Sequence, residues 1–189
     1  MTDKMLLHAC CGPCSIYPSH HLRELEQTFT LYFFNPNIHP YREFKQRLRT
    51  LREFCELEKL ELIVDKSYPL EEFVRNALAE PKSRCYYCYK VRMFKTAQYA
   101  KEQGFTSFAS TLLGSPYQQH EEIKELAEQA ADTYDIEFRY FDFRPGFALG
   151  TQVSKDREMY RQGYCGCIFS ERDRYEKKKE MKGSSDFVL

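Results

Sequence analysis

Cysteine distribution constrains this chain more than any other feature of its sequence. Seven of the eight cysteines fall into three short clusters that lie far apart along the chain, namely Cys10-Cys11-Gly12-Pro13-Cys14, Cys85-Tyr86-Tyr87-Cys88 and Cys165-Gly166-Cys167. In a reducing compartment, clustered thiols are more often metal ligands or redox groups than structural disulfides. We therefore expect a fold that brings these distant segments together around one centre of metal or redox chemistry.

The length and the N-terminus predict a single intracellular folding unit. A length of 189 residues suits one domain, so we treat 1–189 as one unit in which 182–189 form a loose tail. The chain begins without the apolar segment of a secretory signal, and it has no uninterrupted apolar run of about 18 residues. Its 28 basic residues balance its 28 acidic residues, which excludes a general polycation. We expect a cytoplasmic protein that has no membrane partner.

Strand-like and helix-like segments alternate through most of the chain. Apolar runs predict strands at 5–9, 29–34, 60–64, 105–111 and 136–143. Helical spacing predicts helices at 15–27, 41–59, 69–79, 85–103 and 118–133, followed by terminal helices at 146–164 and 170–181. Such alternation favours an α/β fold with a mostly parallel, Rossmann-like sheet flanked by helices and a helical C-terminal part. The first cysteine cluster, Asn35, Ser110 and Asp142 then lie at the carboxyl ends of strands, where such sheets bind ligands.

The first two cysteine clusters fit three kinds of site. Cys85 and Cys88 face one direction on a helix and can share a metal. With Cys11 and Cys14 they could form a structural zinc site, but the adjacent Cys10 adds a thiol that a closed four-ligand site does not need. An iron-sulfur cluster accommodates neighbouring cysteines on different irons, so we favour the cluster over zinc. The string Cys11-Gly12-Pro13-Cys14 also matches a thioredoxin-like dithiol, which would leave the other clustered cysteines without a role.

The third cluster differs from the other two because one residue separates its thiols. A disulfide between Cys165 and Cys167 would be strained, and Gly166 supplies the backbone freedom that its closure demands. Strained disulfides are easily reduced, so this pair suits electron relay, and the alternative is a second pair of metal ligands. The remaining cysteine, Cys55, lies on the apolar face of the predicted helix at 41–59 and is expected in the core.

Two basic stretches suggest contact with RNA. Between residues 81 and 101 the sequence has six cations and no acid, interleaved with aromatic residues. Further cations lie on the preceding helix at Arg42, Lys45, Arg47, Arg49 and Arg52. This mixture suits phosphate contacts and base stacking, and the alternative is an ordinary solvated helix face. No glycine-rich nucleotide-binding motif is present in the sequence, so we expect electrons from another source than a nucleotide cofactor.

The chain resembles the QueH family of epoxyqueuosine reductases over nearly its whole length. The resemblance rests on Leu7-His8-Ala9-Cys10-Cys11-Gly12-Pro13-Cys14, Asn35-Pro36-Asn37-Ile38-His39-Pro40, Arg84-Cys85-Tyr86-Tyr87-Cys88, Ser115-Pro116-Tyr117-Gln118-Gln119-His120, Asp142-Phe143-Arg144-Pro145-Gly146-Phe147 and Tyr160-Arg161-Gln162-Gly163-Tyr164-Cys165-Gly166-Cys167. It implies a fold like that of the adenine nucleotide α-hydrolases. It also implies the last step of queuosine synthesis, a two-electron removal of the epoxide oxygen of epoxyqueuosine at the wobble position of tRNA.

The same resemblance implies the cofactor and the partners. A [4Fe-4S] cluster is expected on Cys10, Cys11, Cys85 and Cys88, with Cys165 and Cys167 as a redox-active pair that an external electron donor serves. Cys14 could bind a second, mononuclear iron, donate a proton or pack in the core; Tyr117, His120 and Asp142 are further candidates for proton donation or metal binding. The contrasting hypothesis is a zinc-stabilised RNA-binding module that catalyses no reaction.

Overall fold

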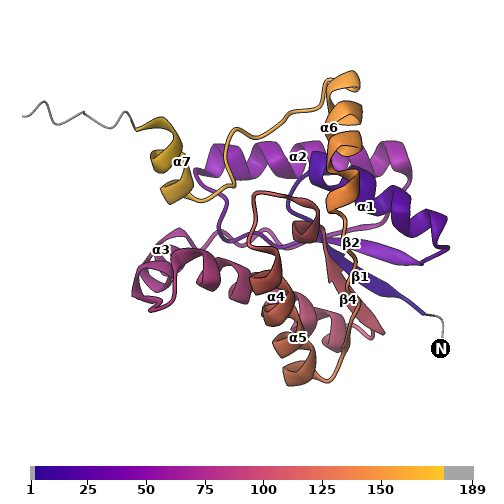
Figure 1. Ribbon diagram of the computed structural model, residues 1–189, viewed down its shortest axis with the longest axis horizontal. Helices are drawn as coiled ribbons and strands as arrows, with labels where there is room; N and C mark the ends of the chain where they lie inside the picture. Colours follow the sequence, from indigo (N-terminus) through magenta and orange to yellow (C-terminus); the bar gives the residue numbers. More distant parts are fainter. Residues whose placement is uncertain (1–2, 177–189) are drawn as a thin grey trace, which may run out of the picture.

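Within residues 3–176, which the computed structural model describes, a five-stranded parallel sheet forms the centre of the fold. Its strands are β1 (Met5–His8), β2 (Phe29–Phe33), β3 (Leu62–Val64), β4 (Ser107–Ser110) and β5 (Glu137–Phe138). They lie in the order β3-β2-β1-β4-β5, and every neighbouring pair is parallel (Figure 1). Every residue of β1 and β4 is buried, as expected for central strands that helices cover on both faces. The predicted Rossmann-like α/β fold is confirmed.

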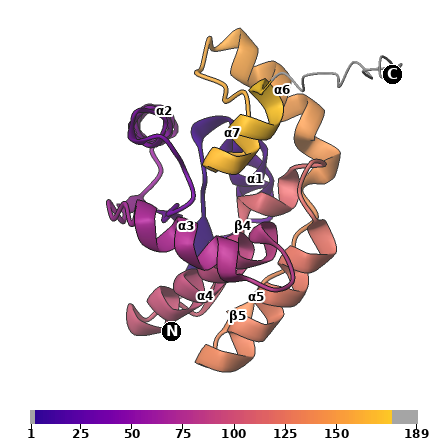
Figure 2. The same cartoon turned by 90° about the vertical axis from the view of Figure 1, so that its left-hand side faces the viewer.

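Helices cover both faces of this sheet. They are α1 (Gly12–Glu24), α2 (Tyr41–Glu58), α3 (Leu70–Ala79), α4 (Arg84–Glu102), α5 (His120–Tyr134), α6 (Phe147–Asp156) and α7 (Ile168–Tyr175), with 3-10 turns η1 (Thr111–Gly114) and η2 (Arg144–Gly146). α1 and α2 lie together on one face, and α4 and α5 lie together on the other (Figures 1 and 2). None of the helices described within residues 3–176 combines the length and the apolar character needed to cross a membrane.

The pattern of α2 shows how the sequence sets this arrangement. Phe44, Leu48, Leu51 and Phe54 recur at helical spacing and are all buried, so the helix presents one apolar face to the sheet. Cys55 lies on the same face and is buried, which confirms the prediction that it belongs to the core. The helix ends in a left-handed residue immediately after Glu58.

The order of the strands creates one crevice at the carboxyl edge of the sheet. From β1 the chain moves outward to β2 and β3, and it then returns past β1 to β4 and β5. The loops that follow β1 and β4 therefore diverge in opposite directions, and such switch points are where open α/β sheets bind ligands. Cys10 follows β1 at this point, and Thr111 follows β4.

The last predicted strand is shorter in the structure than at 136–143. β5 ends at Phe138, after which the chain leaves the sheet, although the Arg139 amide still donates to the Phe108 carbonyl. Phe141 and Phe143 stack on each other and meet the ring of His21 on α1 edge to face. The apolar residues that suggested a longer strand therefore pack beside α1.

The predicted helix at 146–164 is also shorter in the structure. α6 ends at Asp156, where Glu158 adopts a left-handed conformation and the amide of Met159 bonds back to the carbonyl of Ser154. A left-handed residue followed by this backward bond is a Schellman cap, which ends a helix. Residues 157–167 then form an irregular segment. α7 covers the first part of the helix predicted at 170–181, and the predicted tail at 182–189 lies outside the described residues.

Candidate metal and redox site

Three thiols converge at the N-terminus of α1. The Sγ atoms of Cys10 and Cys11 lie 3.8 Å apart, those of Cys11 and Cys14 lie 2.6 Å apart, and all three lie within 4.8 Å of one another. Cys11 caps the helix, because its sulfur accepts the amide of Cys14, and Pro13 suits the first turn. The Cys11-Gly12-Pro13-Cys14 string therefore belongs to α1 and is not a separate loop. Among residues 3–176, no other His, Cys, Asp or Glu side chains form such a group.

Two buried arginines favour negative charge on these sulfurs. The side chains of Arg47 on α2 and Arg92 on α4 are almost completely buried. Hydrogen bonds with the thiols of Cys11 and Cys14 hold the pKa of Cys10 below its ordinary value, and Arg47 lowers it further. Metals bind the thiolate form of cysteine, so this environment suits Cys10 as a metal ligand, whereas burial raises the pKa of the Cys11 thiol.

The other two cysteine clusters lie at the same cavity. A cavity of about 470 Å³ is lined by six cysteines, namely Cys10, Cys14, Cys85, Cys88, Cys165 and Cys167. Cys11 is buried behind them and does not line the cavity. The fold thus brings together segments that are far apart in the sequence, as the cysteine pattern predicted. The volume is within the range of pockets that bind small molecules.

The second cluster is held at the start of α4. Ser83 caps this helix and accepts the amide of Tyr86, which places Cys85 and Cys88 in its first two turns. Burial raises the pKa of Cys88 to about 11, and Arg92 partly offsets this by donating from Nη2 to Cys88 Sγ at 3.1 Å. Arg92 thus offsets, from the protein interior, part of the cost of placing negative charge on the Cys88 sulfur.

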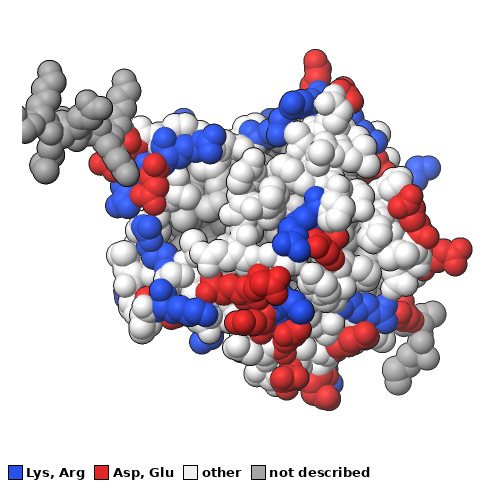
Figure 3. Space-filling view, in the orientation of Figure 1, with Lys and Arg blue, Asp and Glu red and all other residues white. Residues whose placement is uncertain are grey.

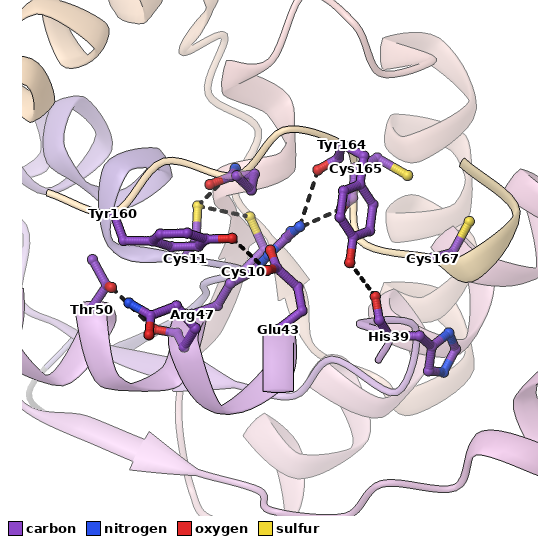
Figure 4. A network of polar contacts seen from close by, with 12 residues as sticks. Cys10, Cys11, His39, Glu43, Arg47, Thr50, Tyr160, Tyr164, Cys165 and Cys167 are labelled. Carbon is purple, nitrogen blue, oxygen red and sulfur yellow. Dashed lines mark hydrogen bonds and ion pairs between the residues drawn. The ribbon is translucent and has the colours of Figure 1, made fainter. Parts of the chain in front are cut away.

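Arg47 also fixes the third cluster (Figure 4). Its guanidinium donates to Glu43 Oε1 at 2.6 Å and to the carbonyls of Tyr164 and Cys165, each at 3.0 Å. The amide of His39 donates to the Gly166 carbonyl at 2.7 Å, and the Tyr164 hydroxyl donates to the His39 carbonyl. The Cys165-Gly166-Cys167 segment is therefore tied to α2 and to the loop after β2.

Gly166 meets two requirements of this segment. Its φ is +130°, a conformation that residues with a side chain rarely adopt. A Cβ atom at this position would also come within 3.1 Å of Arg47 Nη1. The backbone conformation leaves Cys165 exposed, and hydrogen bonds with Cys167 and Ser170 lower the pKa of Cys165 to about 5. The pair thus contains one activated thiol beside the cavity.

The remaining predicted residues lie in different places. Tyr117 lines the cavity, and its side chain is 84% exposed. His120 is buried and bonds Tyr140 through Nε2 at 3.0 Å, while Asp142 pairs with Arg144 at 2.6 Å. Neither His120 nor Asp142 lines the cavity, so their catalytic role stays a prediction.

The prediction that Arg47 and Arg92 contact RNA from the protein surface is wrong. Arg47 and Arg92 were grouped with surface cations for RNA contact, yet both are buried beside the cysteines. The sequence did contain a signal that these arginines have partners in the protein. Glu43 and Cys88 each precede their arginine by four residues, which places the two side chains of each pair side by side on a helix. Sequence reasoning also missed Gln162, whose Nε2 atom donates to Cys11 Sγ at 3.2 Å and to Cys14 Sγ at 3.4 Å.

The donor set fits a thiolate-bound metal centre. Converging cysteine sulfurs are the ligands of iron-sulfur clusters and of zinc, and two buried cations offset the negative charge that such a site concentrates. Cys10, Cys11 and Cys14 therefore form a candidate metal site. Whether Cys14 serves a second, mononuclear iron stays a prediction.

Comparisons with known proteins identify the family of this chain. The family model described as "Epoxyqueuosine reductase QueH" matches residues 5–173. A QueH from Dehalococcoides mccartyi is 36% identical over 177 residues, covering 94% of this chain and 97% of the relative. A QueH from Thermotoga maritima is 32% identical over 187 residues, covering 94% and 95%. In fold, the chain is similar to a predicted tRNA methyltransferase subunit from Methanocaldococcus jannaschii, with a TM-score of 0.50 and 15% identity, covering 82% of this chain and 75% of that one. The chain belongs to the QueH family of epoxyqueuosine reductases.

Proposed function

We propose that this protein reduces epoxyqueuosine to queuosine at the wobble position of tRNA. The epoxide lies on a cyclopentane ring that also carries two hydroxyl groups. Both C–O bonds of the epoxide break, a C=C bond forms in the ring, and the oxygen leaves as water after taking up two electrons and two protons. One observation carries the proposal, which is that six cysteines from three distant segments line a single cavity. Such a cavity suits a nucleoside that is turned out of its RNA strand.

We further propose that Cys10, Cys11, Cys85 and Cys88 hold a [4Fe-4S] cluster. The close approach of Cys10 to Cys11 supports two neighbouring ligands, and the position of Cys85 and Cys88 on the same cavity supports the other two. When bound, such a cluster supplies electrons one at a time. The protein holds these thiols in place through the first turns of α1 and α4.

Cys14 is suited to hold a proton beside the reacting ring. It lines the cavity, and the hydrogen bond with Cys10 raises the pKa of the Cys14 thiol. The thiol therefore keeps its proton at neutral pH and can donate it to the epoxide oxygen as the C–O bond breaks. Protonation matters because a bare alkoxide is a poor leaving group.

The Cys165 and Cys167 pair can supply the full reducing requirement. Oxidation of the Cys165 thiolate and the Cys167 thiol to one disulfide releases two electrons and one proton. Together with the proton held on Cys14, this equals the two electrons and two protons that the epoxide demands. The low pKa of Cys165, about 5, keeps it as a thiolate, the form that reacts. An external reductant then restores the dithiol.

The mouth of the cavity supports a tRNA substrate. Tyr117 and Phe147 meet edge to face there, with ring centroids 5.8 Å apart, and both rings are partly exposed. Arg84, Arg161 and Arg174 also line the cavity. Exposed rings stack on unpaired bases, and arginines bind phosphates. Figure 3 shows a largely uncharged surface between α6 and α7, whereas acidic side chains gather over α5.

Anaerobic reconstitution tests the proposal. The protein is loaded with iron and sulfide, incubated with epoxyqueuosine tRNA and a strong chemical reductant, and the nucleosides are then analysed by mass. We expect about four iron and four sulfide per chain and conversion to queuosine. A colourless protein with one zinc that leaves the tRNA unchanged would instead identify a zinc-stabilised RNA-binding module.

A further inference from the structure

Three polar atoms without hydrogen-bond partners lie on the wall of the cysteine-lined cavity. They are Asn37 Oδ1, Thr111 Oγ1 and Gln162 Oε1, each inaccessible at its atom and without a hydrogen-bond partner, and all three residues line the cavity. The side chains of Asn37 and Thr111 are each only 2% exposed. Folded proteins pair nearly all buried polar groups, because an unpaired one loses its bonds to water without replacement. A ligand that supplies the missing bonds would explain all three.

These residues converge from separate parts of the chain. Asn37 lies in the loop after β2, Thr111 is the first residue of η1 after β4, and Gln162 lies in the segment between α6 and α7. The first two thus follow the carboxyl ends of parallel strands, where side chains can face a ligand without disturbing the sheet. Other buried polar atoms of residues 3–176 also lack partners, for example Ser19 Oγ and Ser107 Oγ, but these two residues do not line the cavity.

The position next to the sulfurs indicates which part of a ligand these groups contact. Gln162 donates its amide Nε2 to the sulfurs of Cys11 and Cys14, and its Oε1 atom has no hydrogen-bond partner. A Cβ at Gly166 would lie 3.3 Å from Asn37 Nδ2, which places Asn37 against the Cys165-Gly166-Cys167 turn. Gln162 therefore adjoins the sulfurs of the first cluster, Asn37 adjoins the backbone of the third cluster, and Thr111 lines the same cavity.

We propose that Asn37, Thr111 and Gln162 form a subsite that binds the hydroxyl groups of the ring undergoing reduction and holds this ring against the cysteine sulfurs. This inference rests on the proposed function. The two amide oxygens accept hydrogen bonds, so the ligand must present donors, and the Thr111 hydroxyl can donate or accept. Such a site selects against a ligand that lacks the matching hydroxyls, because binding that ligand would leave the polar side chains of the protein without hydrogen bonds.

The substitution Thr111→Val tests the subsite because it removes the hydroxyl and keeps the shape of the side chain. We expect kcat/KM for epoxyqueuosine tRNA to fall about tenfold, the loss of one neutral hydrogen bond. We expect Tm to stay the same or to rise, since an unpaired buried hydroxyl becomes a methyl group. The visible absorbance of the cluster should not change. A residue with a purely structural role would instead lower Tm.

Thr30→Val is the matched control. Thr30 is buried on β2, does not line the cavity, and its hydroxyl donates to Glu61 Oε2 at 2.9 Å. This substitution should lower Tm and leave kcat/KM unchanged, which is the opposite pattern. Asn37→Ala provides a second test, because it should weaken binding of epoxyqueuosine tRNA and spare binding of the same tRNA with guanosine at the wobble position.

The outcomes separate the subsite from the proposed function. Turnover by the wild type together with unchanged kcat/KM in Thr111→Val and unchanged tRNA discrimination in Asn37→Ala would overturn the subsite alone. Absence of both turnover and selective binding in the wild type would overturn the proposed function and the subsite with it. Loss of discrimination with retained Tm supports both.

Discussion

Replacing Arg47 with Met removes a buried cation that joins the third cysteine cluster to α2. Methionine fills a similar volume with an apolar chain, so the change chiefly removes charge and donors. Three interactions are lost, one with Glu43 at 2.6 Å and two with the carbonyls of Tyr164 and Cys165 at 3.0 Å each. The side chain of Arg47 is only 1% exposed, so water does not replace them.

The expected loss of stability follows from these contacts. Removing one partner of a buried ion pair costs about 3–5 kcal/mol, because the other charge stays buried without compensation. Glu43 is 10% exposed and still accepts from the Tyr160 hydroxyl, which relieves part of this cost. The two carbonyls add up to about 1–3 kcal/mol each if they stay buried. Taking the ion pair and the carbonyls together, we expect the free energy of unfolding to fall by at least about 3–5 kcal/mol.

Urea unfolding of the anaerobic protein measures this value. The control is Arg49→Met on the same helix, where the side chain is 65% exposed and the change should cost less than about 1 kcal/mol. The double substitution Glu43→Gln, Arg47→Met should recover part of the loss, since it leaves no unpaired charge. A decrease for Arg47→Met no larger than that for Arg49→Met would refute the reasoning.

Three further outcomes are expected. Cys85→Ala should abolish both the visible absorbance of the reconstituted protein and its turnover, whereas Cys55→Ala should retain both; a coloured, active Cys85 variant would defeat its assignment as a ligand. Tyr117→Ala should weaken binding of the tRNA anticodon loop by about 1–3 kcal/mol. Arg161→Gln should reduce the slope of log affinity against log salt concentration by about one. Titrations that give both variants the affinity of the wild type would remove both residues from the interface. Alkylation of reduced Cys165 should stay fast as pH falls from neutrality and decline only near pH 5, because its lowered pKa of about 5 keeps the thiolate populated above that pH; a decline already near pH 8 would contradict this.

The sheet and most helices could be predicted because local chemistry determines them. Apolar runs marked the strands, and the helices predicted at 69–79 and 85–103 correspond closely to α3 and α4. The helix predicted at 146–164 was too long because its cap depends on a left-handed Glu158, a conformation that glycine or asparagine would have signalled better. The convergence of the cysteines followed from their clustering.

Long-range contacts could not be read from the sequence. Arginine on a helix usually faces water, so the burial of Arg47 becomes visible only once the segment at 164–165 is known to lie against α2. The unpaired atoms of Asn37 and Thr111 have no sequence signature at all, since most loop amides and hydroxyls are solvated. The sequence thus predicted which cysteines come together, and tertiary structure was needed for the groups that position them.

The segment at 157–175 contributes to the cavity that would select the substrate, but it is not part of the sheet that forms the centre of the fold. Residues 157–175 supply much of the wall of the cavity, yet α7 buries none of its side chains and the segment adds no strand to the sheet. This wall is held by the bonds of residues 160–166 to Glu43, Arg47, His39 and the first cysteine cluster. Wall residues that make none of these bonds, such as those of α7, can therefore vary to admit a different nucleoside while the sheet and its helices in residues 5–143 keep their packing.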